Sequence, residues 1–128
     1  MNKTTSKKLL TSEKLRIRTN EFAHRCVKFA LALEGTKLGN HISGQLIRCS
    51  TSVAANYRAG CLAQSRPHFR SKLSIVLEEA DESLFWIEFA VDEKLVSESK
   101  VKNLIKEAKE LTAIFYSTRK TLSIKKKC

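Results

Sequence analysis

Two groups of side chains in this sequence could in principle hold a metal centre. The run Glu78-Glu79-Ala80-Asp81-Glu82 is rich in carboxylates, and Glu21 and His24 have the Glu-x-x-His spacing that places both on one helix face. Dinuclear centres in helical bundles need such a motif from each of two helices and a Glu from each of the other two. Neither His41 nor His68 follows a Glu by three residues, so the second motif is missing. We therefore expect no metal and no other cofactor.

Nucleophilic chemistry is also poorly supported. The four cysteines form no Cys-x-x-Cys pair, and three of them lie within apolar helical patterns, which favours buried, reduced thiols (Cys26, Cys49, Cys61 and Cys128). Serine, histidine and acidic residues show no spacing typical of a catalytic triad. We expect that the protein is not an enzyme.

The acidic run has a structural interpretation. Arg48 lies on a helical face otherwise made of Ser, Ala, Val and Cys. If the chain forms a helical hairpin about residues 63–64, Arg48 lies level with Glu78 and Glu79. An arginine inside a bundle needs a carboxylate partner. We predict a buried ion pair between Arg48 and Glu79, or Glu78, that fixes the hairpin register; a ligand-binding role is the alternative.

Charge is unevenly distributed along the chain, whose formal net charge is +11. Residues 1–28 hold eight Lys/Arg and two acids, and residues 119–128 hold five Lys/Arg and no acid. Residues 29–118 hold eleven of each sign and sum to zero. A neutral body with basic ends is typical of a module that packs in its middle and binds a polyanion at its ends.

We predict that this basic pole binds the phosphate backbone of RNA or other nucleic acid, with little sequence specificity. Basic residues near the chain ends and near the turn at 63–64 form the candidate interface: Lys3, Lys7, Lys8, Lys14, Arg18, Arg25, Lys28, Arg58, Arg66, Arg70, Arg119, Lys120, Lys125, Lys126 and Lys127. The alternatives are that the lysine-rich tails only keep the protein soluble, or that they bind a protein partner.

Four helices must position these residues. Apolar residues at helical spacing predict helices over about 12–33, 40–62, 65–93 and from 97 to the C-terminal lysines. The breaks between them are short, so neighbouring helices must be antiparallel, and we expect an all-α, up-down-up-down four-helix bundle. We expect residues 1–128 to form one domain, with 1–11 and 121–128 as flexible basic tails.

Part of the third helix is too apolar for one bundle. Residues 84–91 are apolar nearly all round, whereas a bundle helix needs only one stripe covered. We predict a homo-oligomer whose interface includes Phe85, Trp86 and Phe89; the alternative is a docking groove for another protein. No segment is apolar enough to span a membrane, and we expect a cytoplasmic location.

The sequence also resembles a known family. The stretches FAHRCVKFALAL (residues 22–33), QLIR (45–48), TSVAANYRA (51–59) and SRPHFRSKLSIVLEEADESLFW (65–86) carry the likeness. They are similar to the bacterial four-helix-bundle family of 23S rRNA intervening-sequence proteins, sometimes labelled S23, over roughly residues 15–118. Glu34-Gly35 stands where that family's pattern has a proline, so the first loop differs.

The resemblance implies a four-helix fold and a ring-shaped homopentamer with a central channel. It also implies kinship with accessory proteins of diversity-generating retroelements, which bind nucleic acid and a reverse transcriptase. It implies no agreed activity. A reverse transcriptase-like partner therefore enters only as part of the alternative function, an assembly adaptor that holds another protein.

Overall fold

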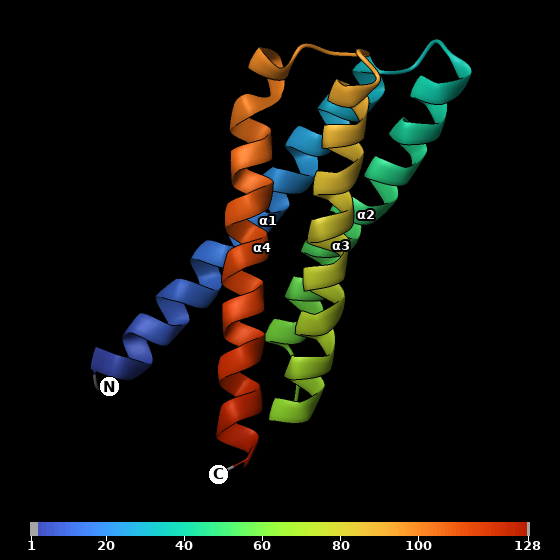
Figure 1. Ribbon diagram of the computed structural model, residues 1–128. Helices are drawn as coiled ribbons and strands as arrows, with labels where there is room; N and C mark the ends of the chain where they lie inside the picture. The colour runs from blue at the N-terminus through green and yellow to red at the C-terminus, as the bar shows by residue number, and fades with distance from the viewer. Residues whose placement is uncertain (1–2, 128) are drawn as a thin grey trace.

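The protein is a bundle of four helices joined by three short turns (Figure 1). The computed structural model describes the backbone of residues 3–127 and the side chains of residues 12–123. The helices are α1 (Lys3–Ala32), α2 (Lys37–Cys61), α3 (Arg66–Asp92) and α4 (Glu98–Lys127). Each helix runs antiparallel to the next, so the predicted up-down-up-down topology is confirmed.

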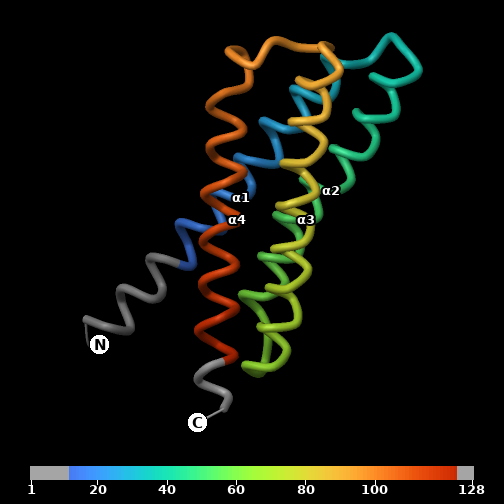
Figure 2. Tube along the Cα trace, viewed as in Figure 1, coloured from blue at the N-terminus to red at the C-terminus, as the bar shows by residue number. Residues whose placement is uncertain are grey.

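The first helix is longer than the sequence pattern predicted, whereas the fourth has the predicted bounds. α1 begins at Lys3 and not near Ser12, and α4 runs from Glu98 to Lys127, as predicted. Side chains of residues 1–11 and 124–128 lie outside the described part of the chain, so the prediction of flexible tails over 1–11 and 121–128 stays a prediction. Followed back towards residue 12, α1 diverges from α4, as the tube in Figure 2 shows.

Local signals explain where α2 and α3 begin. The hydroxyl of Thr36 accepts from the Gly39 N–H at 3.0 Å and caps α2. The hydroxyl of Ser65 accepts from the His68 N–H at 3.2 Å and caps α3, whose first turn holds Pro67. Each cap satisfies one otherwise unpaired N–H and stabilises its helix by about 1 kcal/mol.

The first turn depends on glycine. Gly35 has a φ of +128°, in the left-handed region that L side chains rarely adopt. Gly39 has no room for a side chain, because a Cβ there would lie 1.9 Å from the carbonyl oxygen of Leu33. The tight approach of α2 to the end of α1 therefore requires glycine at both positions.

The core runs the length of the bundle and contains the predicted apolar stripes. Large side chains from all four helices are fully buried, among them Phe22, Leu46, Ile87 and Phe115. Burying an aliphatic or aromatic side chain of this size stabilises the fold by about 1.5–3 kcal/mol. The rings of Tyr57 and Phe115 pack against each other between α2 and α4, with their centroids 5.6 Å apart.

Arg48 lies on the surface, so the prediction of a buried pair is wrong. Its Nη1 lies 3.3 Å from Glu79 Oε2, and its Nη2 contacts Glu82, whereas Glu78 is exposed and makes no described contact with it. The Arg48 side chain is 49% exposed. The hairpin register that brings Arg48 level with Glu79 is present, but water solvates the guanidinium on one side.

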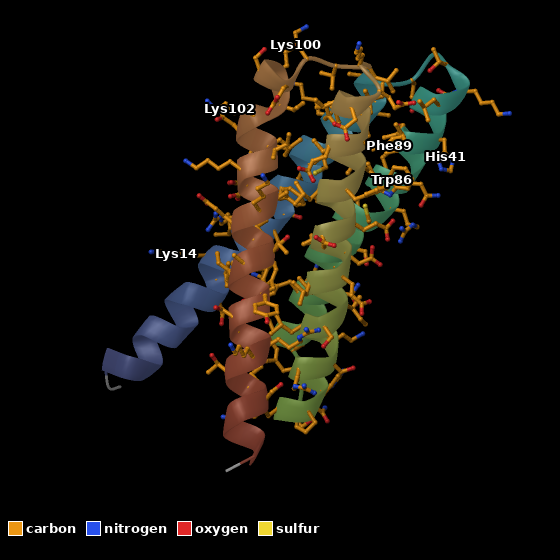
Figure 3. The ribbon with its side chains drawn as sticks, in the orientation of Figure 1. Lys14, His41, Trp86, Phe89, Lys100 and Lys102 are labelled. Atoms are coloured by element: carbon orange, nitrogen blue, oxygen red, sulfur yellow. The ribbon has the colours of Figure 1, made fainter. Side chains whose placement is uncertain are left out.

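An aromatic cluster lies on the outside of α3. Phe85 is 51% exposed, while Trp86 and Phe89 are half-buried. The Phe85 and Trp86 ring centroids lie 4.9 Å apart, and Trp86 packs edge-on against His41 of α2. Figure 3 shows Trp86, Phe89 and His41 together on the opposite side of the bundle from Lys14. One protomer leaves this cluster partly uncovered, and its role as an oligomer interface stays a prediction.

Within the part of the chain that the structure describes, none of the four helices combines the length and hydropathy of a membrane span.

Candidate nucleic-acid interface

Antiparallel packing gathers basic residues at one end of the bundle. The turn between α2 and α3 and the end of α4 lie at this end, and α1 starts towards the same end but diverges from α4 (Figure 1). Segments 12–16, 53–76 and 112–123 hold eight Lys/Arg and a single acid, Glu13. We call these eight residues the basic end: Lys14, Arg16, Arg58, Arg66, Arg70, Lys72, Arg119 and Lys120. Segments 17–52 and 77–111 hold ten Lys/Arg and twelve acids, so the remainder is close to neutral.

Five members of the basic end are exposed to solvent, and apart from Arg16, which pairs with Glu13, they are Lys14, Arg58, Arg66 and Lys120. Lys14 points away from the body of the bundle in Figure 3. These last four come from four different helices, an arrangement that favours contact with successive phosphates of a polyanion.

Other members of the basic end are partly engaged. Arg16 pairs with Glu13 on the surface of α1, and the hydrogen bond from Arg16 lowers the pKa of that carboxyl. Arg70 is half-buried, and its Nε donates to the Ser123 hydroxyl at 2.8 Å. That hydroxyl donates in turn to the carbonyl of Arg119. Arg70 thus fixes the end of α4 against α3.

Arg18 does not belong to the interface, contrary to the prediction. Its guanidinium bonds to Glu107 of α4, with Nε–Oε2 2.8 Å and Nη2–Oε1 2.5 Å, and to Glu110 at 2.6 Å. The hydrogen bonds from Arg18 to Glu107 are the main cause that raises the pKa of Arg18. Two carboxylates neutralise this cation, and its role is to join α1 to α4.

Arg25 and Lys28 are exposed but lie away from the basic end. Lys28 is fourteen residues further along α1 than Lys14, a rise of about 21 Å. The predicted interface therefore contracts to one end of the molecule. The side chains of Lys3, Lys7, Lys8, Lys125, Lys126 and Lys127 lie outside the described residues.

The Glu-x-x-His motif does not face the core. Glu21 and His24 are exposed and line a shallow groove of about 710 Å³ between α1 and α2, together with small residues such as Ala54 and Ala55. A dinuclear centre needs its ligands inside the bundle. The motif therefore belongs to the surface.

Another set of possible metal-ligand atoms lies between α2 and α3. Ligand atoms of Cys49, Glu79 and Glu82 lie within 4.8 Å of one another. The two carboxylates already bind Arg48, and burial raises the pKa of the Cys49 thiol to about 11, which keeps it protonated at neutral pH. Metals bind the thiolate, so this group is a poor metal site. Cys26 is buried as predicted, whereas Cys61 is exposed, contrary to the prediction.

Sequence reasoning missed several residues at this surface. Glu107 and Glu110 are three apart and so share one helical face, which is the signal that could have indicated a joint partner for Arg18. Tyr116 is 53% exposed and lines the same groove as Arg119, and the sequence pattern did not single it out.

Together these features define a helical-bundle protein with a basic surface at one end. A family model described as 23S rRNA-intervening sequence protein matches residues 14–117. The chain belongs to this family.

A solved structure has the same fold. The chain is similar to a protein of unknown function from the S23 ribosomal protein family of Bacteroides thetaiotaomicron VPI-5482, with 28% identity and a TM-score of 0.74. The match covers 82% of this chain and 97% of that one. No curated protein matches the sequence.

Proposed function

We propose that the protein is a non-enzymatic, homo-oligomeric bundle that binds RNA or other nucleic acid through its basic end. The observation that carries the proposal is the segregation of charge: one end holds eight bases against one acid, while the remainder is nearly balanced. A phosphate backbone is the common cellular partner with matching charge density, and neutralising it releases counterions.

Self-association would strengthen such binding. Phe85 is half-exposed and continuous with Trp86 and Phe89, which supports contact with another copy of the chain. The family resemblance adds the expectation of a pentameric ring. Several copies of the basic end on one face would contact one polyanion at once, and such multivalent binding is tighter than that of one copy.

The test compares two double variants that change charge equally. Arg58→Glu with Arg66→Glu alters the basic end, and Arg25→Glu with Lys28→Glu is the matched control at the other end of the bundle. We expect the first to weaken binding of a labelled RNA by about ten-fold or more and to flatten the salt dependence, because phosphate contacts are lost. The control should change affinity by less than about three-fold, since it alters only net charge.

Anisotropy titrations at 50 and 200 mM salt give both readouts. Equal losses for the two variants would mean that RNA responds only to net charge and would contradict a localised interface.

A second candidate function is an assembly adaptor that holds a protein partner, for example a reverse transcriptase-like protein. The aromatic cluster favours it, because Glu82 and Glu88 flank the rings and would repel phosphate. If the wild-type protein binds RNA with no salt dependence, or not at all, this candidate replaces the first.

A further inference from the structure

A groove of about 540 Å³ lies between α3 and α4, separate from the α1–α2 groove, and Lys109 is shared with a neighbouring groove at Phe85 and Phe89. Leu77 and Leu84 give its α3 side an apolar lining, and Tyr116 lies on its α4 side. Tyr116 is 53% exposed, so much of its ring surface contacts water in one protomer.

Cations share the face of α4 that carries Tyr116. Lys109 is seven residues before Tyr116 and Arg119 is three after it, and both spacings return to the same side of a helix. Both cations line the groove. Arg119 also belongs to the basic end, so the groove opens from the surface that we propose binds phosphates.

We propose that this groove takes an unpaired base of single-stranded nucleic acid, which stacks on Tyr116 while Arg119 and Lys109 bind the flanking phosphates. The inference rests on the proposed function and names the form of nucleic acid that it requires. An aromatic ring next to cations is the combination that single-strand binding proteins use, since every base has a face that stacks.

The carboxylates of the groove explain why a duplex fits badly. Glu78 and Asp81 of α3 line the side opposite the cations. A duplex presents phosphates along its whole outer surface and would bring them against these acids. A single strand can turn the edge of a base towards α3, where carboxylates accept hydrogen bonds from exocyclic amino groups. The groove therefore selects for an unpaired base.

The experiment measures binding of the full-length chain to a labelled single-stranded RNA of about 15 nucleotides, a length near the upper site size of one binding module, and to the duplex of the same sequence. The variants are Tyr116→Ala, Tyr116→Phe and Leu62→Ala. Leu62 is the matched control, because it is an exposed apolar residue in the α2–α3 turn at the same end of the bundle. Circular dichroism melts establish that each variant folds.

We expect Tyr116→Ala to weaken single-strand binding by about 5- to 150-fold, the range found when stacking on one base is lost. The salt dependence should not change, because no phosphate contact is removed. Tyr116→Phe should keep wild-type affinity, and Leu62→Ala should have no effect. Duplex affinity should be lower than single-strand affinity and should not respond to Tyr116→Ala.

Unchanged single-strand binding by Tyr116→Ala would overturn the stacking role and leave the proposed function intact. Equal losses on single strand and duplex would also overturn it. Failure of the wild-type protein to bind either RNA would refute the proposed function itself, and the stacking role with it.

Discussion

Arg18 of α1 donates two hydrogen bonds to Glu107 of α4, at 2.8 and 2.5 Å, across 89 positions of sequence. This contact closes the bundle between its first and last helices. The Arg18 side chain is 33% exposed and that of Glu107 is 16% exposed, so the pair is partly shielded from water. Paired hydrogen bonds between arginine and carboxylate are stronger than neutral ones.

Removing this pair should loosen the attachment of α1. We expect Arg18→Ala to lower the free energy of unfolding by about 1–2 kcal/mol, less than for a fully buried pair because the site is partly exposed. Urea denaturation followed by circular dichroism measures the change. Arg25→Ala is the control, because Arg25 is an exposed arginine on the same helix. It should lower the free energy of unfolding by less than about 0.5 kcal/mol.

Arg48 should contribute much less to the stability of the fold than a buried arginine would. It is 49% exposed, and exposed ion pairs contribute about 0–1 kcal/mol. We therefore expect Arg48→Ala to cost about 0.5–1 kcal/mol by the same denaturation measurement. A loss above about 3 kcal/mol would show that Glu79 and Glu82 are left unpaired in a dry site.

Two glycines in α2 should respond in opposite directions to the same change. A Cβ at Gly39 would lie 1.9 Å from the Leu33 carbonyl oxygen, so Gly39→Ala should destabilise by about 2 kcal/mol or more. Gly44 has no atom within 4 Å of its added Cβ, so Gly44→Ala should stabilise by about 0.5–1 kcal/mol through helix propensity. Thermal melts of the two variants measure both changes in stability. If both variants were stabilised, or both destabilised, the result would contradict the packing described at the first turn.

Alkaline pH should destabilise the fold through its buried thiols. Burial raises the pKa of Cys49 from 9.0 to about 11, so the unfolded chain releases this proton at lower pH than the folded one. Stability should therefore fall as pH rises from about 9 to 11, by up to about 1.4 kcal/mol per pH unit for one thiol. Burial also raises the pKa of Cys26. Urea midpoints at pH 8 and 10 give the size of the fall, and Cys49→Ala should reduce it.

The aromatic cluster should control assembly. We expect Phe85→Glu to dissociate the oligomer, because a charge would be buried without a partner at the contact. Leu31→Glu is the control, since Leu31 is equally exposed but lies outside the cluster. Light scattering after size exclusion measures the mass of each. A monomeric wild-type protein at micromolar concentration would contradict the prediction.

Helix number, order and hairpin register could be predicted from the sequence because apolar spacing and short turns determine them. Arg48 and Glu79 lie level as the α2–α3 hairpin requires. Their exposure could not be predicted, since a small rotation of a helix about its own axis moves a long side chain from the core to the solvent. The partners of Arg18 were missed for a related reason: they depend on how α1 meets α4, two helices that no turn connects.

The candidate site shows the same division. The gathering of Arg58, Arg66 and Lys120 at one end follows from topology alone. Ion pairs with carboxylates decide which of the cations can bind a phosphate. Such pairs can form between helices that are distant in sequence, so the sequence pattern does not show them. Tyr116 was missed because its neighbour Phe115 is fully buried, and the two differ only by one step around α4.

The segregation of charge gives the molecule a large permanent electric dipole. Antiparallel neighbours largely cancel their backbone dipoles, so charged side chains set its direction, from the nearly neutral end towards the basic end. In the field of a polyanion the protein would rotate as it diffuses and would arrive with its basic end first. Such steering raises the rate of productive encounter, and added salt slows it by screening the field. Orientation would thus precede contact, and the groove at Tyr116 would meet a strand already aligned along the end of the bundle.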